Sequence, residues 1–402
     1  MNQKHLMMKP VRKEYMEQYN ELLRYVFQVT DQELSSLGWE EQEIIRAKFP
    51  TMEKADVIGW FDKDSLISQV AVYPMKISIF GRIYDMGGLT GVGTYPEYSG
   101  RGLMHKLLEQ ALRNMRDKEQ YITYLYPYSI PYYRKKGWEI ISDKISYEIK
   151  DYQLPKRTQT VGTIRRVDID SEELKDTYER YARHTHGAIL RDELAWNEYW
   201  LWNTDDITAA IYYNKKGEQD GYVIYWISNN IFHIKDMVFI NEEAREGLWN
   251  FVSAHFSMID KVVGDTFTDE PLSFLLEDAD IKEMIAPYYM ARIVDFTKFV
   301  ENYPFKPDTQ VRGWEFQLTD PMLEFNQGTF RLTVDRSGKG KAERIDLVCT
   351  DEINIQTMTT MLMGYKRPDY LYKIGRIQAS ESTIDMLEDA IEQQVPYISD
   401  YF

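Results

Sequence analysis

A glycine-containing loop between a strand and a helix constrains the fold more than any other part of this sequence. Residues 89–95 predict a strand interrupted by glycines, and Gly100-Arg101-Gly102 leads into a helix over residues 103–116. Apolar side chains recur in that helix at spacings of three and four, so one face is buried. Residues 121–126 predict a returning strand, which gives the order strand, glycine loop, helix, parallel strand. This unit indicates a mixed α+β fold.

The start of this helix is a candidate anion site. The first N–H groups of a helix lack partners within it, and the macrodipole adds roughly half a positive charge. Gly100 and Gly102 let backbone amides approach a diphosphate, and Arg101 adds charge. A plain glycine-rich turn is the alternative. Gly91 and Gly93 weaken pairing in the preceding strand, which would leave amides free to hold an acyl carbonyl or an oxyanion.

A second candidate segment follows the returning strand. Residues 131–139 read Pro-Tyr-Tyr-Arg-Lys-Lys-Gly-Trp-Glu, where a tyrosine could stand beside a leaving sulfur. For Tyr124, Tyr126 and Tyr128, just before it, a core position is at least as good an interpretation.

In the first part of the chain, helical spacing occurs at residues 14–26 and 40–48, and alternation predicts strands at residues 57–61, 66–72, 75–80 and 83–86.

The rest of the chain predicts two further domains. Residues 162–280 repeat the coarse plan as a degenerate second copy, with helices at 178–183 and 243–256 and strands at 209–213, 221–226 and 231–239. Its loop carries three glutamates within residues 241–247, which would repel a pyrophosphate, so we expect no coenzyme there. From residue 291 a small α+β domain is predicted, with strands at 292–297, 311–318, 328–334 and 343–349 and helices at 352–363, 370–374 and 382–391. The expected domains are residues 1–150, 151–288 and 289–402.

Composition excludes several classes of function. The formal charge of −16 opposes a phosphate backbone, so nucleic acids are not expected partners. An acidic surface favours cationic ligands, although it also serves plain solubility. Cys349 is the single cysteine, which favours a reducing compartment, and no apolar run is long enough for a membrane span. We therefore expect a cytoplasmic protein. His184 and His186 are the only close histidine pair and have no evident third ligand, so we expect solvated loop histidines and no metal site.

The residues quoted above resemble a known family. The run over residues 92–108, the segment over residues 133–139 and the strand–helix order are similar to a GNAT N-acetyltransferase domain. The whole chain, with its degenerate copy, its sterol-carrier-like last domain and its C-terminal Phe402, resembles the enhanced intracellular survival (Eis) acetyltransferases. The fold implied is tandem GNAT-like domains followed by a sterol-carrier-protein-like domain. A homo-oligomer, a hexamer in that family, is implied as well.

The resemblance also implies a co-substrate and its site. Acetyl-CoA would be held by backbone amides of the splayed strand and of the loop and helix start. Ser99 and Met104 depart from the family loop pattern, whereas Gly102 keeps it. His105 is either a coenzyme contact or a plain position on the helix surface. The candidate coenzyme residues are Val92, Gly93, Thr94, Ser99, Gly100, Arg101, Gly102, Leu103, Met104 and His105.

Two catalytic residues are implied in the same way. The general acid would be Tyr133 rather than Tyr132, and the base would be the terminal carboxylate of Phe402. A phenol of pKa about 10 protonates a thiolate of pKa about 8.5 at a cost of roughly 2 kcal/mol. A terminal carboxylate of pKa about 3.5 lies about six or seven units below an alkyl ammonium, so we expect it to act through an ordered water or to position an amine that loses its proton on desolvation.

The acceptor implied is a primary amine of a cationic small molecule, such as an aminoglycoside, or a lysine. Acidic residues near the two N-terminal helices are candidates to hold this amine: Asp31, Glu33, Glu40 and Glu41. The alternative function is a lipid-binding or scaffolding protein with an inactive acetyltransferase core. The presence of both Tyr133 and Phe402 favours the enzyme.

Overall fold

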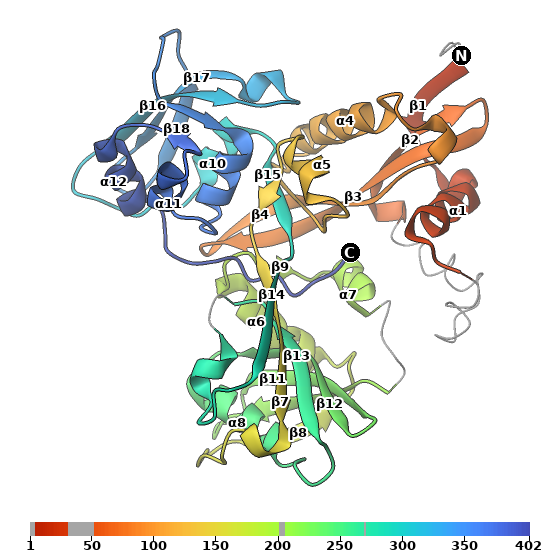
Figure 1. The fold of residues 1–402 in the computed structure, drawn as a ribbon, viewed down its shortest axis with the longest axis vertical. Coiled ribbons are helices and arrows are strands. Elements are labelled where there is room, and N and C mark those ends of the chain that lie inside the picture. The colour runs from red at the N-terminus through yellow and green to blue at the C-terminus, as the bar shows by residue number, and fades with distance from the viewer. Residues whose placement is uncertain (1–4, 31–51, 201–205, 269–270) are drawn as a thin grey trace.

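The computed structural model describes residues 5–30, 52–200, 206–268 and 271–402, which form three units, each built on one β-sheet (Figure 1). In Figure 1 the first unit lies at the upper right, the second at the bottom and the third at the upper left. Helices pack against all three sheets. The mixed α+β fold with two similar units and a smaller last one is therefore confirmed.

The first unit contains an eight-stranded sheet in the order β1-β2-β3-β4-β5-β15-β6, with β9 paired to β3. The strands of this sheet that come from the first part of the chain are β1 (Leu6–Pro10), β2 (Asp56–Asp62), β3 (Ser65–Ile79), β4 (Arg82–Thr94), β5 (Ile122–Leu125) and β6 (Glu139–Ile140). Its helices are α1 (Met16–Phe27), α4 (Leu103–Asp117) and α5 (Ile130–Arg134). Leu107, Leu108, Ala111, Leu112 and Met115 of α4 are buried, as the apolar spacing predicts.

The hairpins of the first unit differ from the expectation. The strands expected at residues 66–72 and 75–80 are one strand, β3, and β4 likewise runs without a break from Arg82 to Thr94. Pro74 does not interrupt β3, because its fixed φ suits extended backbone and only its own N–H is lost. The helix expected at residues 40–48 lies outside the described residues.

The first two units exchange strands. β7 (Asp143–Lys150) leaves the first unit and pairs with β13 (Lys261–Thr266) and β14 (Lys282–Pro287) of the second sheet. β15 (Met290–Ile293) returns to lie between β5 and β6 of the first sheet. The sheets therefore cross the domain boundaries expected at residues 150 and 288, and each unit is completed by chain from beyond its own boundary.

The second unit repeats the plan of the first. Its sheet has the order β14-β7-β13-β12-β11-β10-β8, and β12 and β13 are parallel on either side of a helix, as β4 and β5 are. The helices and strands expected in this copy are present. This part of the chain contains β8 (Thr163–Val167), α6 (Glu172–His184), β9 (Ile189–Leu190), α7 (Glu193–Trp200), β10 (Thr208–Tyr213), β11 (Gln219–Ser228), β12 (Ile231–Phe239) and α8 (Glu242–Ser253). Of these, β8, β9 and α7 were not expected from the sequence.

The third unit is a five-stranded sheet, β18-β17-β16-β19-β20, with four helices. Its elements are α9 (Phe296–Asn302), β16 (Arg312–Thr319), β17 (Gly328–Val334), β18 (Gly340–Arg344), β19 (Glu352–Asn354), α10 (Ile355–Leu362), α11 (Pro368–Lys373), β20 (Ile377–Gln378) and α12 (Glu381–Ala390).

Three expected boundaries in this part of the chain were wrong. The strand expected at residues 292–297 ends at Ile293, because the Asp295 side chain accepts from the Lys298 amide and starts α9. The strand expected at 343–349 is β18, which ends at Arg344. The helix expected from residue 352 begins at Ile355, after Asn354 caps it and residues 352–354 pair in parallel with β16.

The last segment of the chain crosses from the third unit to the other two. Figure 1 shows it leaving α12 and ending beside α7. The Tyr397 amide donates to the carbonyl of His186 at 2.8 Å. His186 is fully buried and stacks on Phe80 with ring centroids 3.7 Å apart, so its expected place in a solvated loop was wrong. His184 is exposed.

Candidate active site

β4 and β5 separate halfway along β4. The two strands pair in parallel only from Met86 to Gly88, and β4 then continues to Thr94 without β5 beside it. A bulge displaces the register between β3 and β4 in the same stretch, where Gly91 has a φ of +60°. The expected splay of this glycine-containing strand is thus present. A Cβ on Gly91 would lie 2.7 Å from the Tyr19 hydroxyl, so only glycine fits there.

The N-terminus of α4 presents amides that no side chain caps. Gly100 and Gly102 both have a φ of +74°, and a Cβ on either would meet no atom within 4 Å. The open loop and the unpartnered amides of the first turn fit the binding of a phosphate group. The corresponding helix of the second unit, α8, differs, because Asn241 accepts from the Ala244 amide at 2.9 Å and glutamates follow.

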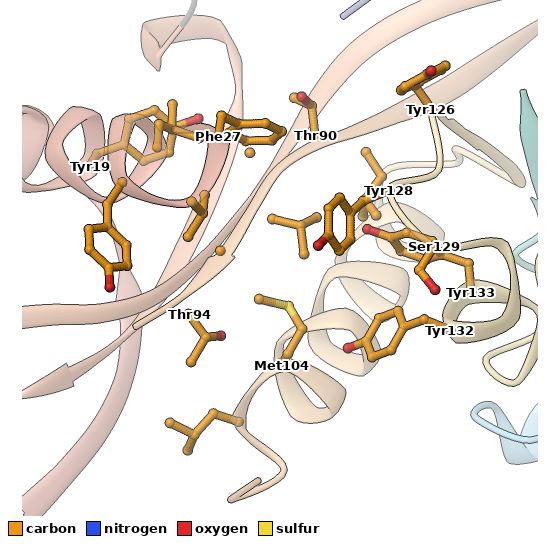
Figure 2. A pocket seen from close by; sticks show the side chains of 18 of the residues that line it. Tyr19, Phe27, Thr90, Thr94, Met104, Tyr126, Tyr128, Ser129, Tyr132 and Tyr133 are labelled. Atoms are coloured by element: carbon orange, nitrogen blue, oxygen red, sulfur yellow. The ribbon is translucent and has the colours of Figure 1, made fainter. Parts of the chain in front are cut away.

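A single cavity of about 1350 Å³ joins the splayed strand to the start of α4. Figure 2 shows Tyr128, Tyr132 and Tyr133 on the side of Met104, and Tyr19 and Phe27 of α1 on the other side. All the coenzyme and catalytic residues proposed from the sequence line this cavity: Val92, Gly93, Thr94, Ser99, Gly100, Arg101, Gly102, Leu103, Met104, His105, Tyr133 and Phe402. Tyr126 and Tyr128 line it as well, whereas Tyr124 is buried in the core.

Tyr133 is buried within this wall. Its side chain lies in α5, is 5 % exposed and contacts the rings of Tyr132 and Trp138 at centroid distances of 5.2 and 6.0 Å. Burial raises the pKa of the Tyr133 phenol, and the neighbouring Tyr132 raises it further. The phenol therefore keeps its proton at neutral pH, although giving that proton to a thiolate is more uphill than for a free tyrosine.

A buried arginine of β15, paired with an aspartate of the third unit, supports the helix that carries Tyr133. Gly137 has a φ of +93°, and a Cβ there would lie 1.5 Å from Nη1 of Arg292. Arg292 is fully buried, donates to the Lys136 carbonyl at 2.6 Å and is paired with Asp320 at 2.6 Å. Gln356 of α10 donates to the Arg134 carbonyl at 3.2 Å. The glycine four residues after Tyr133 is thus required by the close approach of an arginine.

Phe402 lies at the point where β4 and β5 separate. Its ring is 5.5 Å from that of Tyr289 and 6.4 Å from that of Tyr73, between centroids. A Cβ on Gly88, the last β4 residue paired with β5, would lie 2.8 Å from Cε2 of Phe402. The C-terminal residue and Tyr133 therefore line one cavity, although 269 positions separate them in the chain.

The cavity also contains charged residues that sequence reasoning missed. Glu198 of α7 comes from the second unit and is 8 % exposed. Lys136 lies beside the start of α4, with Nζ 3.3 Å from Nδ1 of His105, and burial lowers its pKa. Lys136 stands within the tyrosine segment and could have been noticed there, whereas no motif surrounds Glu198. The acidic candidates Asp31, Glu33, Glu40 and Glu41 lie outside the described residues.

The described residues contain neither a metal-binding cluster nor a helix that could cross a membrane. No group of three or more His, Cys, Asp or Glu side chains there is arranged to hold a metal ion. No helix in the same part of the chain has the length and apolar character that crossing a bilayer requires.

Comparisons with known proteins agree with this architecture. Models of the acetyltransferase (GNAT) domain match residues 7–141 and residues 187–293, and a sterol carrier protein domain model matches residues 296–399. No curated protein sequence matches the chain.

Solved structures are similar over the full length. A probable N-acyltransferase from Enterococcus faecalis is 26 % identical with a TM-score of 0.89, and the match covers 99 % of both chains. A GCN5-related N-acetyltransferase from Anabaena variabilis is 22 % identical with a TM-score of 0.86 over 99 % of this chain and 100 % of its own. Eis1 from Mycobacterium abscessus has the same fold at 18 % identity, with a TM-score of 0.80 over 99 % and 100 % of the two chains.

An acyl-CoA donor is implied by these matches, and the cavity has the uncapped helix start and the splayed strand that such a donor needs. The chain is accordingly an enzyme of the GNAT N-acetyltransferase family, with two GNAT units followed by a sterol-carrier-like unit.

Proposed function

We propose that this enzyme transfers an acetyl group from acetyl-CoA to a primary amine of a cationic acceptor, either an aminoglycoside-like molecule or a lysine-type amine. The observation that carries the proposal is the single cavity that contains the start of α4, the splay of β4, Tyr133 and Phe402. These four features supply a diphosphate site, amides along the donor, a proton donor and a carboxylate.

The donor would lie along the splayed strand. Amides of residues 103–105 at the start of α4 would hold the diphosphate, because they are uncapped and lie at the positive end of the helix dipole. Amides of Val92, Gly93 and Thr94 would hold the rest of the donor along β4. The thioester would then lie between Tyr133 and the point near Gly88 where β4 and β5 separate.

The reaction forms a bond between the acceptor nitrogen and the acetyl carbon and breaks the bond between that carbon and sulfur. Tyr133 would give the departing thiolate its proton. The terminal carboxylate of Phe402 would accept the ammonium proton through an ordered water, or would orient an amine that loses this proton as the cavity desolvates it.

Negative charge within the cavity supports a cationic acceptor. Glu198 lies with Tyr19 and Tyr73 on the cavity wall. Burial is the main cause that raises the pKa of both phenols, and the charge of Glu198 raises it further. A carboxylate that shares a cavity with tyrosine rings fits an alkyl ammonium, because it supplies charge while the rings attract the cation through their faces. The same carboxylate favours the charged form of the amine, which opposes the deprotonation that the reaction requires.

The test is thiol release from acetyl-CoA with a panel of polyamines, aminoglycosides and lysine peptides, together with neutral alcohols of similar size. Release with the cationic amines alone is expected, and Glu198→Gln should raise the KM for the amine at least fivefold while leaving the KM for acetyl-CoA within twofold. Glu193→Gln, at an exposed position of the same helix, is the matched control. Turnover with neutral acceptors and no preference for amines would contradict the proposal.

The fate of the C-terminus separates the enzyme from its alternative. Adding two residues after Phe402 should lower kcat strongly while coenzyme A binding, measured by calorimetry, is retained. Unchanged kcat would remove the carboxylate from the reaction. No release with any amine would favour the lipid-binding or scaffolding alternative. A cytoplasmic location and a homo-oligomer, a hexamer by family resemblance, are further proposals that fractionation and light scattering can check.

A further inference from the structure

We infer that the second unit has a positioning role in the reaction of the first: its Arg191 anchors Asp400 and thereby holds the C-terminal carboxylate in the cavity. This inference rests on the proposed role of the Phe402 carboxylate. It gives a function to a unit whose own helix start, in α8, is capped by Asn241 and followed by glutamates.

Arg191 stands where the first two units meet. It follows β9, whose residues Ile189 and Leu190 pair with β3 of the first sheet. Its side chain is 0 % exposed. Nε donates to Oδ1 of Asp400 at 2.7 Å and Nη2 to Oδ2 at 3.3 Å, so the guanidinium holds this carboxylate through two nitrogens. A forked contact of this kind fixes orientation as well as distance.

A second buried carboxylate completes what we call the Arg191 cluster (Arg191, Asp236 and Asp400). Asp236 of β12 lies 3.8 Å from the guanidinium. Burial raises the pKa of Asp236, whereas Arg191 and hydroxyl donors favour its charged form. Those hydroxyls belong to Tyr199, Tyr222 and Tyr397, whose oxygens lie 3.2, 3.1 and 3.0 Å from the carboxylate.

Aromatic rings and one amine enclose the cluster. The guanidinium carbon lies 3.7 Å from the ring centroids of both Tyr178 and Tyr199. Lys235 also approaches, with Nζ 4.3 Å from the centroid of the Tyr199 ring. Two tyrosines contact Asp400 directly. The Tyr288 hydroxyl donates to the Asp400 carbonyl at 2.8 Å, and the Tyr178 hydroxyl, which donates to the Ile189 carbonyl at 2.8 Å, lies 3.3 Å from Oδ2 of Asp400.

This arrangement is better suited to positioning than to stability. Desolvating three charges is costly, and apolar side chains of similar volume often hold a fold as well as a buried ion pair does. Only directional bonds fix where a chain points. Two residues span about 7 Å at most, so fixing both the side chain and the carbonyl of Asp400 restricts the terminal carboxylate to a small volume. The Phe402 ring against Gly88 restricts it further.

Asp400→Asn tests the anchor, because it keeps the shape of the side chain and removes its charge. We expect kcat to fall at least tenfold, while the KM for acetyl-CoA and the coenzyme A affinity stay within twofold. Carboxypeptidase Y should release Phe402 at least fivefold faster than from the wild type. Asp389→Asn, at an exposed position of α12, is the matched control and should change none of these.

A second variant covers a failure of Asp400→Asn to fold. Tyr288→Phe removes the hydroxyl that donates to the Asp400 carbonyl, and we expect faster release of Phe402 together with a lower kcat at unchanged KM for acetyl-CoA. Wild-type kcat and wild-type release of Phe402 in the folded variants would overturn the anchor.

The C-terminal extension separates this result from the proposed function. If the extension lowers kcat while Asp400→Asn and Tyr288→Phe behave as wild type, the positioning role of Arg191 and Asp400 is wrong. The proposed role of the Phe402 carboxylate is then retained. If the extension has no effect, the proposed role of the carboxylate is wrong, and the anchor falls with it.

Discussion

Gly137→Ala measures how strongly Arg292 of β15 supports the helix that carries Tyr133. The new Cβ would lie 1.5 Å from Nη1 of Arg292, and ordinary contact needs at least 3.4 Å, so the guanidinium must move by about 2 Å. The positive φ costs alanine about 1–2 kcal/mol. Losing the charged hydrogen bond from Arg292 to the Lys136 carbonyl costs about 1.5–3 kcal/mol. The sum is about 3–5 kcal/mol of unfolding free energy.

Gly81→Ala separates these two contributions. Gly81 lies in the same unit with a φ of +80°, but a Cβ there would meet nothing within 4 Å, so its variant reports the backbone cost alone. Urea unfolding followed by tryptophan fluorescence should show Gly137→Ala to be about 1.5–3 kcal/mol less stable than Gly81→Ala. Its kcat should fall while coenzyme A binding changes little. Equal stability of the two variants, with wild-type turnover in both, would show that the contact of Arg292 with the Lys136 carbonyl does not support this helix.

Three further variants test other parts of the cavity and the tail. Tyr133→Phe should lower kcat about 10²-fold or more and leave the coenzyme A affinity within twofold by calorimetry, and a wild-type rate would assign the acid elsewhere. Gly88→Ala places a Cβ 2.8 Å from the Phe402 ring and should lower kcat several-fold at unchanged acetyl-CoA KM; an unaffected kcat would mean that the ring position does not matter. Burial lowers the pKa of His186 from 6.5 to about 4. Between these two pH values the unfolded chain therefore binds more protons at this residue than the folded chain does. The contribution of His186 to the unfolding free energy is complete above about pH 6.5 and falls by about 3 kcal/mol toward pH 4. In urea unfolding at pH 7 and pH 4.5, His186→Gln should lower the unfolding free energy less at the lower pH. An equal loss at both pH values would contradict the lowered pKa of His186.

Local features of this protein could be predicted from its sequence. The strand, loop and α4 are specified by neighbouring residues, and the donor site consists largely of their backbone amides. Gly100 and Gly102 permit the loop wherever the rest of the chain goes, because a left-handed φ depends on a missing Cβ and not on distant contacts. The glycine at position 137 likewise marked the tyrosine segment, although the arginine that requires it was not apparent.

Only the tertiary structure decided which distant residues share the cavity. The exchange of β7 and β15 joins strands that no local pattern distinguishes from ordinary neighbours. Glu198 is one of 64 aspartates and glutamates, and Arg191 is one of 48 lysines and arginines. Neither residue stands in a motif. Their roles depend on burial and on partners up to 209 positions away, and these arise only when the sheets of two units pack together. Contacts of this range follow from global packing, which residue order along a short segment does not encode.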